Sequence, residues 1–110
     1  MKEELHKKRC EACTIGAEPL KPEEIAEYME SLDCGWEVVD NHHLERVFRF
    51  KNFVEALDYV NRVGALAEEE QHHPDISLSW GKVVLTLFTH KIDGLSESDI
   101  VFAAKIDRMK

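Results

Sequence analysis

The residues best suited to chemistry in this sequence are two adjacent histidines, His72 and His73, which stand between an acidic run and Pro74. Imidazole is the side chain that takes up or releases a proton near neutral pH without help from its surroundings. Glu68 lies four residues before His72, so the two side chains share a face if a helix extends that far. Pro74 disfavours helical geometry at His73, so we expect this histidine to leave the helix and point away from the first.

Three other residues, which follow later in the sequence, fit the same site. His90 follows the apolar run 83–89 and is expected at the end of a strand, where a side chain can face a cleft. Trp80 offers either a core filler or a flat apolar wall for a ring-shaped ligand, and by itself it fits the core better. Asp99 stands three residues after Ser96, a spacing that resembles a capping box with aspartate in place of glutamate or glutamine. We therefore interpret Asp99 first as a helix cap and second as a site residue.

A zinc centre is the alternative interpretation of these histidines, since His72, His73 and His90 would supply three ligands of a hydrolytic site. Adjacent residues rarely ligate one tetrahedral ion, however, and two histidines at helical spacing are missing. Cys10 and Cys13 have the spacing of a zinc knuckle or a redox dithiol, but no matching second pair follows them. We therefore expect no metal ion.

Length and charge narrow the class of protein. A chain of 110 residues, 44% hydrophobic and 33% charged, is typical of one globular domain. The net charge of -8 disfavours binding to nucleic acid, and the basic cluster at residues 6–9 is too short to reverse this. No apolar run has the length that a bilayer requires, and the beginning of the sequence lacks an apolar signal core. The odd number of cysteines argues against a disulfide framework. These features predict a cytoplasmic protein without nucleic acid or membrane partners.

The first half of the sequence predicts a flexible leader over residues 1–19 and the start of a folded domain over residues 20–110. Pro22 suits the first turn of a helix that continues to about Leu32. Two short runs rich in β-branched and aromatic residues, 36–40 and 44–50, predict a β-hairpin. His42 and His43 fall in its turn and receive no role, like His6 in the leader.

The second half repeats this order of elements. Apolar residues recur at helical spacing from Asn52 to Ala67. Runs 76–80 and 83–89 predict a second hairpin, and a last helix follows from Ser96 to about Asp107. The order α-β-β-α-β-β-α predicts an α+β fold, a four-stranded antiparallel sheet with helices packed on one face. Both faces of the last strand are apolar, which favours self-association.

The spacing of the candidate site residues resembles the signature of the pterin-4a-carbinolamine dehydratase family: Glu68-x3-His72-His73-Pro74-x5-Trp80-x9-His90-x8-Asp99. The similarity extends through residues 35–36, 48–50 and 94–96 and covers roughly residues 20–107. The family's fold is a four-stranded antiparallel sheet with helices on one side. The resemblance also implies a homodimer or homotetramer, with sheets joined across subunits.

The activity implied by this resemblance is the dehydration of a 4a-hydroxytetrahydropterin to quinonoid dihydropterin and water. This recycles the tetrahydropterin of an aromatic amino acid hydroxylase and requires no cofactor. By the same resemblance, His72 and His90 form an acid/base pair, and His73 binds and orients the pterin and takes part in catalysis. The resemblance leaves open which histidine is the acid.

The resemblance gives three further residues supporting roles. Glu68 would tune or orient His72, Trp80 would pack near the pterin ring, and Asp99 would help to hold the site. Two alternatives stay open on the same fold. One is a molybdopterin-linked, pterin-binding role. The other is a dimerisation or assembly module without catalysis.

Overall fold

The computed structural model describes residues 19–109 of the chain. Residues 1–18 of the predicted leader, which include Cys10 and Cys13, lie outside the described residues. The elements, in chain order, are α1 (Pro22–Met29), β1 (Glu37–Val39), β2 (His43–Arg49), α2 (Phe53–Glu70), β3 (Asp75–Ser79), β4 (Lys82–Leu87), the short 3-10 helix η2 (His90–Ile92) and α3 (Glu97–Arg108).

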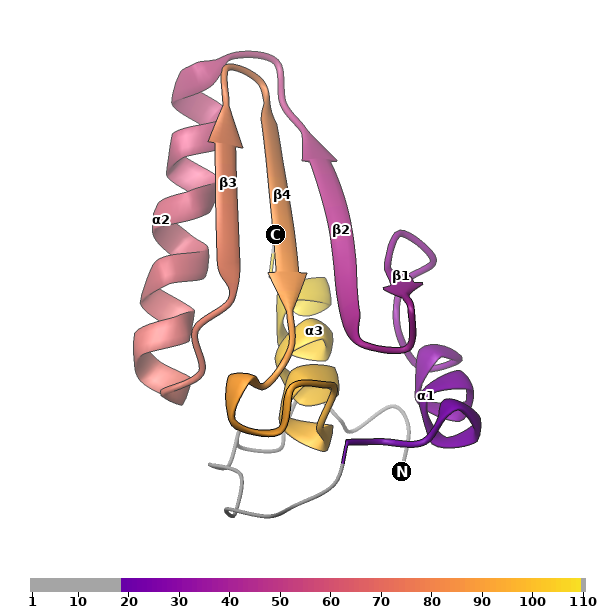
Figure 1. Cartoon of the computed structure of the whole chain (residues 1–110). Helices are drawn as coiled ribbons and strands as arrows, with labels where there is room; N and C mark the ends of the chain where they lie inside the picture. The colour runs from indigo at the N-terminus through magenta and orange to yellow at the C-terminus, as the bar shows by residue number, and fades with distance from the viewer. Residues whose placement is uncertain (1–18, 110) are drawn as a thin grey trace.

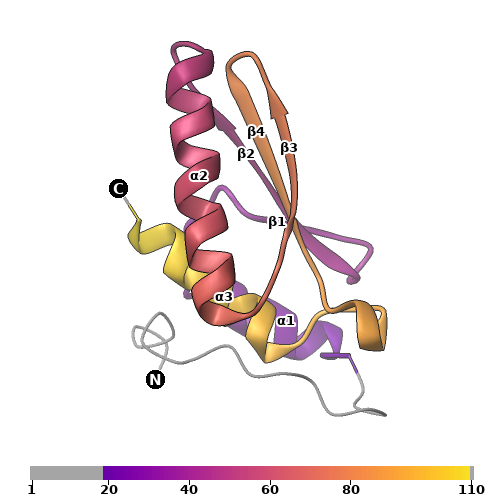
Figure 2. The same ribbon diagram turned by 90° about the vertical axis from the view of Figure 1, so that its left-hand side faces the viewer.

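The four strands form one antiparallel sheet in the order β1-β2-β4-β3 (Figure 1). Two hairpins, β1–β2 and β3–β4, lie side by side, so the second strand of each is central. Figure 2 shows α2 and α3 on the same side of this sheet. The predicted α+β fold, with its element order α-β-β-α-β-β-α, is therefore confirmed, and η2 is an addition to it.

The core lies between the sheet and the helices. Alternate residues of β4 point into it, and the side chains of Val83, Leu85 and Leu87 are completely buried. Eight of the twelve residues of α3 are buried, which makes α3 the central helix rather than a surface helix with one apolar stripe. The side chain of Tyr28 on α1 donates a hydrogen bond to Glu97 on α3 at 3.0 Å, which joins these two helices.

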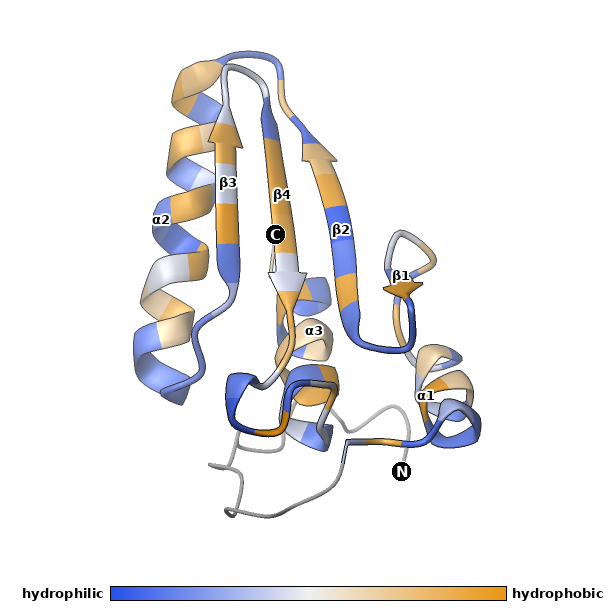
Figure 3. Cartoon of the chain, viewed as in Figure 1, coloured by the Kyte–Doolittle hydropathy of each residue, from blue (hydrophilic) through white to orange (hydrophobic). Residues whose placement is uncertain are grey.

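The face of the sheet that points away from the helices is mixed in character. Figure 3 shows hydrophobic residues along most of β4. Val84 is half-buried on this outer face, and its register partner Val47 on β2 is 44% exposed. The apolar character that the sequence predicted for both faces of this strand is therefore present, and a small apolar patch stays exposed. No helix in the described part of the chain is long and apolar enough to cross a membrane.

Element ends differ from the predictions by a few residues, each time at a turn. Helix α1 ends at Met29 rather than Leu32, and the chain continues through tight turns in which Leu32 itself is buried. Strand β2 begins at His43, which was predicted to lie in the turn. That turn is built by Asp40 and Asn41, both in the left-handed region with φ of 54° and 55°, and aspartate and asparagine tolerate this conformation well.

Candidate functional site

A completely buried carboxylate, that of Asp99, organises the candidate site at the start of α3. Its Oδ2 atom accepts hydrogen bonds from the backbone N–H of Ser96 at 2.9 Å and from the hydroxyl of Thr89 at 2.8 Å. Its Oδ1 atom lies 2.7 Å from Nε2 of His72. A buried carboxylate is stable only where hydrogen bonds replace its lost water. Asp99 is therefore a helix cap, as predicted, and also the partner of a histidine.

His72 is held so that one ring nitrogen remains available. Its side chain is 14% exposed, and its ring lies 5.6 Å from the ring of Phe102. Because the carboxylate of Asp99 accepts at Nε2, that nitrogen carries a proton and the neutral ring presents an unprotonated Nδ1. Nδ1 has no hydrogen-bond partner among residues 19–109. An imidazole fixed by a carboxylate on one nitrogen and free on the other is suited to proton transfer.

Glu68 pairs with His73 and not with His72, so the expected pair is wrong. Helix α2 ends at Glu70, and Gln71 takes a left-handed conformation with φ of 56°. This reversal carries His72 toward α3 and brings Nε2 of His73 to 2.6 Å from Oε2 of Glu68. Both side chains of this pair are more than half exposed. The two histidines do diverge, as expected, one toward a buried carboxylate and the other toward an exposed one.

His90 lies at the start of η2, is exposed, and packs its ring 4.2 Å from that of Phe88. Its chain neighbour Thr89 donates to Asp99, the same carboxylate that binds His72. Asp99 therefore links the segment that carries His72 to the segment that carries His90. This brings the two residues predicted as an acid/base pair to the same end of the molecule.

His42 and His43, which received no role in the sequence analysis, lie at this end as well. Nε2 of His42 is 2.8 Å from a carboxylate oxygen of Asp93, and its Nδ1 is 3.0 Å from Nδ1 of His43. In the neutral pair His42 donates to Asp93 and accepts from His43. The ring of Phe88 lies 4.7 Å from His42 and thus contacts the rings of His42 and His90. That these histidines lie near His90 follows only from the contact between the β1–β2 turn and η2, and no sequence motif predicts it.

Trp80 is not brought to the histidines within this chain. It lies in the β3–β4 turn and is 68% exposed, so it is not a core residue. Strand β3 begins two residues after His73 and leads away from it, so its five residues put roughly 17 Å between the histidines and this turn. In Figure 1 the β3–β4 turn and η2 lie at opposite ends of the sheet.

Within the described residues, no three or more histidine, cysteine, aspartate or glutamate side chains are grouped so that they could hold a metal ion. His72 and His73, which a zinc site would use together, bind two different carboxylates. The arrangement instead offers separate imidazoles that could each exchange a proton with a bound molecule.

Comparisons with known proteins point to one family. The model of the family described as pterin 4 alpha carbinolamine dehydratase matches residues 18–109. A protein of Rubrobacter xylanophilus named for pterin-4-alpha-carbinolamine dehydratase is 62% identical over 106 residues, which are 96% of this chain and 98% of that protein. A protein of Alkaliphilus metalliredigens with the same name is 59% identical over 106 residues, which are 96% of this chain and 96% of that protein.

A solved structure gives the same result. The crystal structure of a transcriptional coactivator/pterin dehydratase from Brucella melitensis superposes with a TM-score of 0.75 at 34% sequence identity. The match covers 82% of this chain and 96% of that one. The similarity therefore extends over almost the whole of that protein and over most of the residues described here.

Proposed function

This chain belongs to the pterin 4 alpha carbinolamine dehydratase family, and from this premise we propose that it dehydrates a 4a-hydroxytetrahydropterin. The product is a quinonoid dihydropterin, ready to be reduced and used again as tetrahydropterin. The observation that carries the proposal is the pairing of His72 with the buried Asp99 beside the segment of His90. Such a pairing fixes an imidazole for proton transfer.

The reaction breaks the bond between C4a and its hydroxyl oxygen and the bond between N5 and its hydrogen. The electron pair of the N–H bond forms the C4a=N5 double bond, and the hydroxyl leaves with a proton as water. One group must donate that proton and another must accept the proton from N5. His72 and His90 form this acid/base pair, and the nitrogen next to C4a already activates the leaving group. The proposed reaction uses no metal ion or cofactor.

The neighbouring residues support this pair. His73 with Glu68 forms an exposed hydrogen-bonded unit that binds and orients the polar pterin edge and exchanges protons with it. Asp99 acts as a positioning residue, because it touches His72 and is itself completely buried. Trp80 contributes to pterin binding only if a second copy of the chain brings it to the histidines.

We place the reaction in the cytoplasm, next to an aromatic amino acid hydroxylase whose spent cofactor is the substrate. We also propose a homodimer or homotetramer. The partly exposed apolar side chains on the outer face of the sheet, Val47 and Val84, support self-association. Light scattering coupled to size exclusion would report a mass of two or four chains, and a mass of one chain would contradict this part of the proposal.

Stopped-flow absorbance tests the activity directly. A 4a-hydroxytetrahydropterin is generated chemically, and its decay is followed with and without the protein in buffer treated with a chelator. Faster decay with the protein supports a dehydratase that requires no added metal. Decay at the buffer rate would contradict the proposal, and it would favour a non-catalytic assembly role. The Brucella melitensis protein is described as a transcriptional coactivator as well as a pterin dehydratase, so a role besides dehydration is named for that relative.

A further inference from the structure

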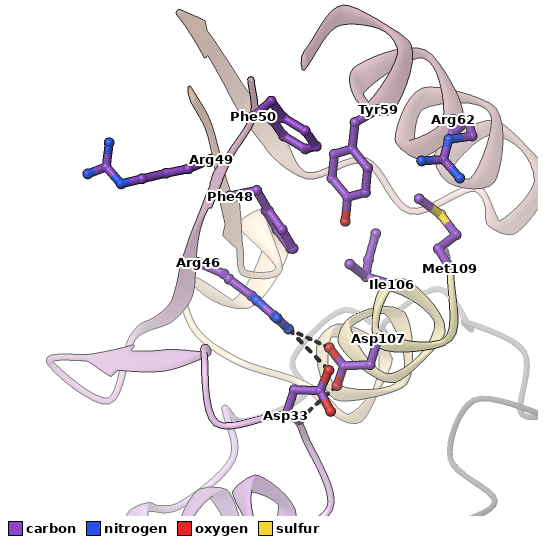
Figure 4. Close-up of a pocket in the computed structure, with 10 residues that line it drawn as sticks. All are labelled: Asp33, Arg46, Phe48, Arg49, Phe50, Tyr59, Arg62, Ile106, Asp107 and Met109. Carbon is purple, nitrogen blue, oxygen red and sulfur yellow. Dashed lines mark hydrogen bonds and ion pairs between the residues drawn. The ribbon is translucent and has the colours of Figure 1, made fainter. Parts of the chain in front are cut away.

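A pocket with a volume of about 300 Å³ lies at the other end of α3 from Asp99. Figure 4 shows the residues that line it. Its walls come from β2 and the residue that follows it, from the middle of α2, and from the end of α3. None of the histidines that form the candidate site lines it. Any ligand of this pocket is therefore a different molecule from the proposed substrate, or a second copy of it.

The floor of this pocket is an ion pair that fixes α3 to the sheet. Oδ1 of Asp107 accepts from the guanidinium of Arg46 and from the indole N–H of Trp36, both at 2.7 Å. Its Oδ2 accepts from the backbone N–H of Asp33 at 2.9 Å. Burial raises the pKa of the Asp107 carboxyl, although these hydrogen bonds act in the opposite direction. Contacts within the chain itself thus hold the floor of the pocket in place.

One wall of the pocket is aromatic. The ring of Tyr59 lies 4.8 Å from that of Phe48 and 5.2 Å from that of Phe50, all in tilted arrangements. Phe48 and Phe50 are only half-buried, so part of each ring is open to the pocket. Tilted and offset contacts of this kind are those that aromatic rings prefer, so a further ring is a suitable occupant.

The hydroxyl of Tyr59 gives the pocket a polar group without a partner. Tyr59 is 6% exposed, and its hydroxyl makes no hydrogen bond to any residue of the described part of the chain. Figure 4 shows this hydroxyl directed into the pocket. Burial raises the pKa of Tyr59 to about 12, so the hydroxyl keeps its proton at neutral pH and can donate it to a hydrogen bond. Among the described residues only the hydroxyl of Ser31 is fully buried without a partner, so the hydroxyl of Tyr59 reaches the open space of the pocket and can donate to an acceptor bound there.

The charges around this hydroxyl select an anionic acceptor. The guanidiniums of Arg46 and Arg62 each lower the pKa of Tyr59, and each does so more strongly than Asp107 raises it, although burial outweighs all three. The guanidinium carbon of Arg62 lies 5.5 Å from the centre of the Tyr59 ring. The lining of the pocket carries three arginines, Arg46, Arg49 and Arg62, against two aspartates, Asp33 and Asp107, so in a chain with a net charge of -8 it has one more positive group than negative groups.

We propose that this pocket binds a small aromatic carboxylate, whose ring lies against Phe48 and Phe50 and whose carboxylate accepts the hydrogen bond of Tyr59. The volume suits one ring, since a cavity of roughly 150 Å³ is enough for benzene. The remaining space holds the carboxylate on the side of Arg62, since the guanidinium of Arg46 already binds Asp107. A bicyclic molecule with a long side chain exceeds this space.

The test is a titration followed by two-dimensional amide NMR, with sodium benzoate as the probe. The signals of residues around the pocket on β2, α2 and the end of α3 shift with benzoate. Tyr59→Phe, which removes a single oxygen atom, weakens binding about tenfold or more, as expected for a hydrogen bond to a charged group. Its spectrum stays dispersed like that of the wild type.

Three controls make the titration specific. Tyr28→Phe alters the chain's other tyrosine, whose hydroxyl bonds Glu97 instead, and it binds benzoate like the wild type. Acetate tests the carboxylate without a ring, and benzyl alcohol tests the ring without a charge; both bind at least about tenfold more weakly than benzoate. Three results would each overturn the proposal: no shift of the pocket signals with benzoate, equal binding by Tyr59→Phe, or equal binding of benzyl alcohol.

Discussion

Helix α3 carries two carboxylates that bind other parts of the fold, the completely buried Asp99 at its start and the half-buried Asp107 at its end, and their roles differ. Asp99 binds the imidazole of His72, which can gain or lose a proton, and leaves the other ring nitrogen available. Asp107 binds the guanidinium of Arg46 and the indole of Trp36, neither of which titrates near neutral pH. The partner, rather than the carboxylate, therefore decides whether such a contact is suited to proton transfer or to structure.

The largest effect is expected at the histidine end. His72→Ala removes the ring that Asp99 positions, and we expect a loss of activity of about 10²–10⁴-fold, the usual contribution of a positioned acid or base. His90→Ala should have an effect of similar size. Stopped-flow decay of the 4a-hydroxytetrahydropterin measures both. Circular dichroism should show that each variant remains folded, and full activity in both variants would contradict the assigned roles.

The next effect concerns stability at the arginine end. Asp107→Ala leaves the guanidinium of Arg46 and the indole N–H of Trp36 without their partner, in a region where the side chain of Arg46 is only 19% exposed. Leaving these donors without their acceptor in a partly buried site costs about 1–3 kcal/mol of unfolding free energy. Urea denaturation measures it. A loss below about 1 kcal/mol, the range of surface pairs, would show that the pair is not structural.

A smaller effect is expected from the contact between the β1–β2 turn and η2. His42→Phe keeps a ring against Phe88 but removes the hydrogen bond to Asp93, whose side chain is 88% exposed. Exposed pairs contribute up to about 1 kcal/mol. Loss of this pair should therefore lower the activity by less than about fivefold, the rate factor that corresponds to this energy. His42→Gln, which can still donate to Asp93, should restore most of it. A loss as large as that of His72→Ala would place His42 among the catalytic residues.

The smallest effect is a dependence of stability on pH. Burial raises the pKa of Asp107 above its usual value of 3.8, so in this pH range the folded chain binds the proton more tightly than the unfolded chain. Asp107 therefore contributes stability that is fully present below 3.8 and is lost as the pH rises through the folded-state pKa. Asp107→Asn should remove this contribution. Urea midpoints measured across acidic pH check the slope, and an identical slope in both proteins would refute this sign.

Much of this arrangement could be predicted from the sequence, because it depends on local pattern. Helical spacing predicted α2, alternation and turn residues predicted both hairpins, and the spacing of Ser96 and Asp99 predicted the cap of α3. The histidines also stood out, because imidazole is the residue type that titrates near neutral pH.

The remaining features depend on contacts that no local pattern specifies. The left-handed Gln71 redirects the chain, so Glu68 meets His73 instead of His72. The pair of Arg46 and Asp107 joins residues far apart in sequence and follows only from the packing of α3 on β2. Trp80 fitted the core by its sequence but is exposed, because β3 leads the chain away from the histidines to the β3–β4 turn.

One substitution made at both ends of α3 tests the comparison most directly. Asp99→Asn and Asp107→Asn each replace a carboxylate by an amide of the same shape, and stopped-flow decay measures both variants at a temperature where each is folded. Asp99→Asn should lose about 10–100-fold in rate, the value of a hydrogen bond to a charged group, while Asp107→Asn keeps the wild-type rate. Equal rates in the two variants would contradict the claim that Asp99 positions a catalytic histidine and Asp107 a structural arginine.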